Sequence, residues 1–90
     1  MKTLIGEQIK ECENFSLRYL LYEENDCEQF ERNFFSLLVE LNGNEQNDFA
    51  TARDFTADRT IAENMLDSLC SGTVTPVGLP YIIEDYLAEI

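Results

Sequence analysis

Three cysteines, Cys12, Cys27 and Cys70, are the side chains of this chain best suited to act as nucleophiles. A catalytic thiol needs a base that removes its proton, and histidine, the commonest such base, is absent from the sequence. Cys27 lies among carboxylates, which disfavour a thiolate, and Cys70 lies on the apolar stripe of an expected helix. An odd number of cysteines without a CxxC pair indicates free thiols in a reducing compartment. We therefore expect a cytoplasmic protein that is not an enzyme.

Carboxylates, the other groups able to do chemistry, form two clusters along the chain. The first cluster consists of Glu23, Glu24, Asp26, Glu28 and Glu31, and the second consists of Glu84, Asp85 and Glu89. Carboxylate oxygens bind Ca²⁺ or Mg²⁺, but neither cluster has the spacing or the glycine of an EF-hand loop. The first cluster interrupts the apolar pattern and is expected to project from a turn. We expect solvated acidic surfaces, with no metal ion and no cofactor.

The net charge limits the possible partners. Eighteen Asp and Glu against six Lys and Arg give −12 over 90 residues. Such a surface repels nucleic acids and anionic membranes and attracts basic protein patches. The basic residues are dispersed, whereas phosphate contacts need clustered Lys and Arg. No apolar run approaches the roughly 18 residues that a membrane-spanning helix needs.

The elements that carry these residues begin with strands. Length and a 44% hydrophobic content indicate one folded domain over residues 1–90. Alternating apolar residues predict strands over 15–22 and 31–41. Asn42-Gly43 then predicts a type I′ hairpin turn, and a return strand runs from about residue 45 to Phe55. This return strand is expected to place Phe49, Thr51, Arg53 and Phe55 on one face. The segment 3–9 is either a weak strand or a short helix.

Two helices follow the strands. Thr56 or Asp58 is expected to cap the first helix, whose apolar residues recur at helical spacing up to Cys70. Gly72 occupies the position where a left-handed C-cap residue is expected. The second helix begins near Leu79, and its apolar residues continue to the end of the chain.

The assembled prediction is an α+β domain. A three- or four-stranded antiparallel sheet is followed by two helices that pack on one face of the sheet. The opposite face is expected to remain uncovered and to expose Leu20, Tyr22, Phe34 and Leu38, a candidate contact for a partner or a second copy. The alternative is that the N-terminal segment covers this face.

The segment from Asp54 to Leu87, with its D-x-T-x-D-R helix start and its V-T-P-x-x-L connector, resembles a small family of uncharacterised proteins from Clostridia and related Firmicutes. The resemblance implies a bacterial, cytoplasmic setting and a strand hairpin upstream of two helices. It implies no catalytic residues, and the motif residues are expected to act as caps, turns and packing positions.

These observations favour a non-enzymatic interaction module, an inhibitor or an adaptor, that binds a protein with a basic patch. The expected contacts are the first acidic cluster, which would steer the partner, the uncovered sheet face, or both; a homodimer is possible. The alternative is a nucleic-acid mimic that blocks a DNA- or RNA-binding protein such as a nuclease, as small acidic anti-CRISPR inhibitors from phages do.

Overall fold

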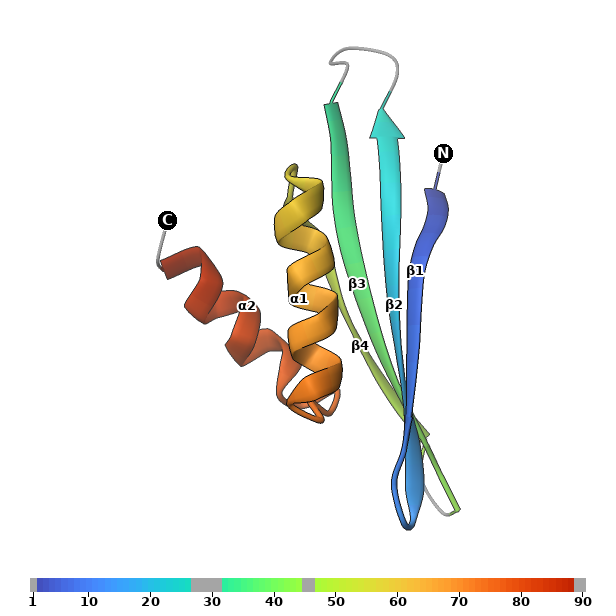
Figure 1. Ribbon diagram of the computed structural model, residues 1–90. Coiled ribbons are helices and arrows are strands. Elements are labelled where there is room, and N and C mark those ends of the chain that lie inside the picture. Colours follow the sequence, from blue (N-terminus) through green and yellow to red (C-terminus); the bar gives the residue numbers. More distant parts are fainter. Residues whose placement is uncertain (1, 27–31, 45–46, 89–90) are drawn as a thin grey trace.

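The fold is an α+β sandwich of two layers, a four-stranded antiparallel sheet and a pair of helices (Figure 1). The computed structural model describes residues 2–26, 32–44 and 47–88. The strands are β1 (Lys2–Glu11), β2 (Phe15–Asp26), β3 (Arg32–Gly43) and β4 (Asn47–Thr56), in that order across the sheet. The helices α1 (Arg59–Ser71) and α2 (Leu79–Ala88) follow. The predicted class, element order and one-sided helix layer are confirmed, and the segment 3–9 is part of a strand.

Long strands make the molecule elongated. Its principal extents are 45 × 28 × 18 Å. The two central strands each contain 12 residues, which at about 3.3 Å per residue span roughly 40 Å. Helix α1, with 13 residues, is about 20 Å long at 1.5 Å per residue and covers only part of the sheet. The other face of the sheet carries no described element.

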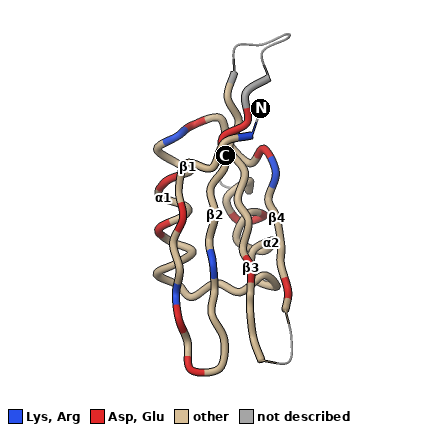
Figure 2. Tube along the Cα trace, turned by 90° about the vertical axis from the view of Figure 1, so that its right-hand side faces the viewer, with Lys and Arg blue, Asp and Glu red and all other residues tan. Residues whose placement is uncertain are grey.

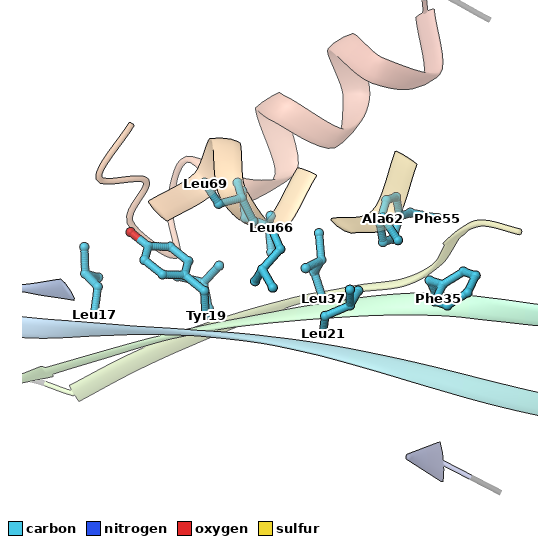
Figure 3. Close-up of a cluster of buried hydrophobic side chains, with 11 residues drawn as sticks. Leu17, Tyr19, Leu21, Phe35, Leu37, Phe55, Ala62, Leu66 and Leu69 are labelled. Carbon is cyan, nitrogen blue, oxygen red and sulfur yellow. The ribbon is translucent and has the colours of Figure 1, made fainter. Parts of the chain in front are cut away.

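The core lies between the sheet and the helices. Leu17, Tyr19 and Leu21 of β2 point toward the helix layer beside Leu37 of β3 (Figure 3), and all four are at most 1% exposed. The helix layer contributes Ala62, Leu66, Leu69 and Leu79. Burying a leucine side chain stabilises a fold by roughly 1.5–3 kcal/mol before the entropy of ordering it is subtracted. Alternation in the strands and the 3.6-residue period in α1 therefore converge on one apolar layer.

Strand β2 is longer than its apolar pattern predicts. It continues through Glu23, Glu24 and Asp26, which pair in register with Phe35, Phe34 and Arg32 of β3. The expected turn over this segment is therefore wrong for its first part. The Asn33 side-chain amide donates to the Glu23 carboxylate at 3.3 Å. This polar segment stays extended because it pairs with β3. The local sequence pattern does not indicate this pairing.

The connection between β3 and β4 also differs from the prediction. Gly43 still belongs to β3 and pairs with Phe15, and Asn42 pairs with Asn47 at the start of β4. Neither Asn42 nor Gly43 has the positive φ that a type I′ turn requires. The connection is therefore longer than two residues, and its residues 45 and 46, where the return strand was expected to begin, lie outside the described residues.

A bulge near the end of β4 changes which face Phe55 occupies. The register shifts between the Leu37–Ala52 and Phe35–Thr56 pairs, and Asp54 has a φ of 51°. The Asp54 N–H donates to the Ser36 hydroxyl at 3.0 Å, which holds the bulge. Phe55 is therefore turned into the core, where it is 7% exposed, and the expected face shared with Phe49 and Thr51 is wrong for this residue.

The ends of α1 are fixed by Asp58 and Thr73. The Asp58 carboxylate accepts hydrogen bonds from the N–H groups of Thr60 and Ile61 at 2.8 and 3.2 Å, which decides between the two predicted caps. The left-handed residue after the helix is Thr73, with a φ of 52°, and not Gly72, which keeps a helical φ of −86°. The prediction for Gly72 is wrong because the helix runs one residue further than expected.

Helix α2 packs against the β4 side of the sheet. Leu79 is fully buried at its start, and Ile82, Ile83 and Tyr86 are half-buried. The Tyr86 ring meets Phe55 edge to face with centroids 6.2 Å apart. The Tyr86 hydroxyl lies 3.3 Å from the Thr56 hydroxyl. The helix is therefore anchored at one end and along one face, and it leaves other apolar side chains at the surface.

Candidate functional site

The candidate site is the face of the sheet turned away from the helices, which we name the open face. Register places cross-strand partners on the same face, so the open-face residues follow from the pairs in the sheet. They include Leu4, Glu7 and Ile9 of β1, Arg18, Leu20 and Tyr22 of β2, Phe34, Ser36, Leu38 and Glu40 of β3, and Phe49 and Thr51 of β4. All four apolar residues predicted for this face lie on it.

Exposure varies across the open face. Phe49 is 69% exposed, Ile9 61% and Leu4 45%. Tyr22, Phe34 and Leu38 are half-buried. Leu20, expected to be exposed, is 2% exposed, because Glu7 and Leu38 flank it on the neighbouring strands. Leu20 therefore forms the floor of the face, and the side chains around it meet the solvent.

A row of four side chains crosses the open face from edge to edge. Ile9, Arg18, Glu40 and Phe49 are successive cross-strand partners on the four strands. Arg18 Nε donates to a Glu7 carboxylate oxygen, and Arg18 Nη1 lies 3.9 Å from Glu40 Oε2. The hydrogen bond to Glu7 raises the pKa of the Arg18 guanidinium above its usual value. One cation between two carboxylates leaves a net negative charge at the centre of the face.

A groove on the open face runs beside this row. Leu38, Glu40, Phe49 and Thr51, with Asn42, Asn47 and Asp48, line a space of about 550 Å³. Its lining is mostly apolar and includes the carboxylates of Glu40 and Asp48. In Figure 2, which looks onto this face, the central strands β2 and β3 are mostly uncharged along their length. The face offers apolar contact bordered by carboxylates, a combination suited to binding.

The described members of the first acidic cluster, Glu23, Glu24 and Asp26, lie in strand β2 and not in the projecting turn that was predicted. Glu23 and Glu24 are half-buried strand residues, and Asp26 is the last residue of β2. Glu24 pairs with Phe34 on the open face, whereas Glu23 pairs with Phe35 on the helix side. Glu28 and Glu31 lie outside the described residues. Glu23 and Glu24 therefore lie on opposite faces at one end of the sheet.

The second acidic cluster lies on α2, where Glu84 and Asp85 are exposed and Glu89 is outside the described residues. Within residues 2–26, 32–44 and 47–88, no group of three or more His, Cys, Asp or Glu is arranged to hold a metal ion. Cys12 and Cys70 are free, half-buried thiols, and Cys27 lies outside the described residues.

The sequence pattern did not identify the exposed contributions of β1 and β4 to the open face. Leu4 and Ile9 belong to a segment whose type was undecided. The alternation put Phe49 on one face of the return strand, but only the register decides whether that face is turned toward the helices or away from them. The ion pairs of Arg18 with Glu7 and Glu40 join three strands, so no spacing within one segment reports them. Alternation along β1 could have indicated Ile9 once the segment was taken as a strand.

One comparison with known proteins assigns a family. A model described as a family of unknown function, DUF6514, matches residues 1–89. The chain belongs to the DUF6514 family. The match extends the predicted resemblance, which covered residues 54–87, to all four strands. No curated protein and no solved structure matches the chain.

Neither α1 nor α2, the helices of the described residues, is long and apolar enough to cross a bilayer.

Proposed function

We propose that this DUF6514 protein is a non-enzymatic, cytoplasmic interaction module, an adaptor or inhibitor, that binds a partner protein on the open face of its sheet. One observation carries the proposal: apolar side chains from all four strands lie on a face that no described element covers. Exposed apolar surface with a polar border is the usual composition of a protein-binding site.

The charge of the chain specifies the chemistry of the partner. The net charge is −12, and on the open face Glu7 and Glu40 outnumber Arg18 between them. A second copy of the chain would bring two surfaces of the same sign together. A partner with an apolar centre and a rim of Lys and Arg is complementary, and its approach would be accelerated by long-range attraction. Glu24, at the end of the face, would then contribute to steering.

The proposal is tested with two lysine substitutions at equally exposed positions. Phe49→Lys changes the open face, and Val77→Lys changes the connector before α2; both side chains are 69% exposed. Each protein is immobilised and exposed to a lysate of the cells that express it, at low and high salt, and retained proteins are quantified by mass spectrometry. A protein retained by the wild type and by Val77→Lys but lost with Phe49→Lys supports the proposal.

The same experiment contains the outcomes that contradict it. Equal retention by the two variants shows that the partner binds elsewhere. The nucleic-acid mimic remains the alternative function, and its support is the net charge alone. It predicts that added DNA or RNA displaces the retained protein, that salt removes it steeply, and that Phe49→Lys has little effect. Self-association of the wild type that Phe49→Lys abolishes would replace the foreign partner with a second copy.

A further inference from the structure

A second groove lies at one edge of the sheet, between the edge strand β4 and helix α2. It has a volume of about 400 Å³. Ala52 and Phe55 of β4 line it on one side, and Leu79, Ile83 and Leu87 of α2 line it on the other. Ile83 is half-buried and Leu87 is 52% exposed, so the groove opens to solvent along the helix. We propose that this groove binds an extended peptide segment that adds to β4 as a fifth strand.

The backbone of β4 faces the groove with main-chain groups that the sheet does not use. Strand β4 is at the edge of the sheet, since only β3 pairs with it among the described strands. The Phe49 N–H donates to the Asp48 carboxylate at 2.8 Å, whereas the Asp54 N–H points to Ser36 of β3. Alternation along a strand then directs the main-chain groups of Thr51 away from β3.

Thr51 and Arg53 also line the groove, so outward main-chain groups and apolar walls occur at the same place. An extended segment satisfies such backbone groups, because strand addition supplies one N–H and one C=O at every second residue. The side chains on one side of the added segment then point under α2, toward Ile83 and Leu87. A globular surface or a helix would leave the edge of β4 unpaired.

The charges on the walls specify the side chains of the segment. Helix α2 has Glu84 in the groove and Asp85 beside it, and it contains no Lys or Arg. Asp54 adds a carboxylate from the bulge of β4, against the single cation of Arg53. Because successive side chains of a strand point to opposite faces, every second residue of the segment enters the groove. The complementary segment has apolar residues at these positions and a Lys or Arg at one of them, which meets the carboxylates of α2 and β4.

The test uses a random library of linear peptides displayed on phage as the probe. The library is selected on the wild type with Leu87→Lys as the competitor, and an enriched sequence is synthesised for calorimetry. We expect the enriched sequences to have apolar residues at every second position, with a Lys or Arg at one position of the same set. We also expect Leu87→Lys to weaken binding of the synthetic peptide by about tenfold or more. Leu4→Lys, at a similarly exposed position on the open face, is the matched control and should leave the affinity unchanged.

Backbone methylation of the peptide separates strand addition from simple apolar contact. N-methylation at alternate residues in the register that faces β4 should abolish binding, and N-methylation in the other register should be tolerated. This comparison leaves the protein unaltered, so a folding defect cannot produce it. Equal effects in both registers, or no peptide enriched over the Leu87→Lys competitor, would overturn the proposal. Self-association that Leu87→Lys abolishes would also overturn it, in favour of a second copy at this edge.

Discussion

The buried hydroxyl of Tyr19 provides a quantitative test of the core. Tyr19 is fully buried, and its hydroxyl donates to the Val74 carbonyl oxygen at 2.9 Å, which ties the connector between the helices to the sheet. Tyr19→Phe keeps the ring but removes this hydrogen bond and leaves the carbonyl without its donor. At neutral pH we expect the free energy of unfolding to fall by about 1–2 kcal/mol. In a domain of this size each kcal/mol corresponds to a decrease in Tm of about 4–8 °C.

The same hydroxyl gives the opposite result in alkali. Burial, with a smaller contribution from the Cys70 and Cys12 thiols, raises the pKa of Tyr19 to about 12. The pKa of an unfolded tyrosine is about 10, so below that pH the group is protonated in both states and adds no pH dependence. Between about pH 10 and pH 12 only the unfolded state releases the proton. The wild type therefore loses up to roughly 3 kcal/mol across this range.

The two effects together predict a crossover. The loss in the wild type reaches about 1.4 kcal/mol near pH 11 and about 2 kcal/mol near pH 11.5, which cancels the cost of the substitution. Above that pH the Tyr19→Phe protein should be the more stable of the two. Guanidinium chloride denaturation followed by circular dichroism over a pH series measures the difference, in which contributions from groups common to both proteins cancel.

Tyr81→Phe is the control for loss of a hydroxyl, since Tyr81 is 67% exposed. At neutral pH it should change the free energy of unfolding by less than about 0.5 kcal/mol. A stability difference between wild type and Tyr19→Phe that stays constant from neutral pH to about pH 11.5 would show that Tyr19 does not retain its proton in the folded state, contrary to the structure.

Three further substitutions test local features, each by thermal and denaturant unfolding. Thr73→Gly should raise the free energy of unfolding by about 1 kcal/mol, because Thr73 adopts a left-handed conformation that a β-branched residue disfavours. An unchanged free energy of unfolding would show that this conformation of Thr73 does not destabilise the fold. Asp58→Ala should lower it by about 1 kcal/mol through loss of the N-cap, with Asp58→Asn as the control that keeps a capping oxygen. Gly6→Val should lower it by about 1–3 kcal/mol, because a Cβ on Gly6 would lie 2.9 Å from Leu66 Cδ2; a neutral result would mean that Leu66 moves aside freely.

Features that depend on neighbours in the chain follow from the sequence. The alternation over residues 15–22 placed Leu17, Tyr19 and Leu21 on one face, and the structure buries all three against the helices. The apolar stripe and the two candidate caps, Thr56 and Asp58, located the start of α1 within about two residues, and the structure selects Asp58. These patterns succeed because a strand or helix repeats its geometry over a few residues. The residues of one segment are therefore enough to predict that element.

Other features exist only because distant segments meet. The polar end of β2 stays extended because β3 pairs with it, and Phe55 enters the core because Ser36 of β3 holds a bulge at Asp54. Register fixes which side chains share a face, and it is set by the whole sheet. The sequence alone determined the net charge and the two-layer fold. The central apolar residues of the open face also follow from the sequence, but the contributions of β1 and β4 to this face, the ion pairs of Arg18 across it and the groove between β4 and α2 were decided by the tertiary structure. Each of these is built from segments whose contacts no local pattern records.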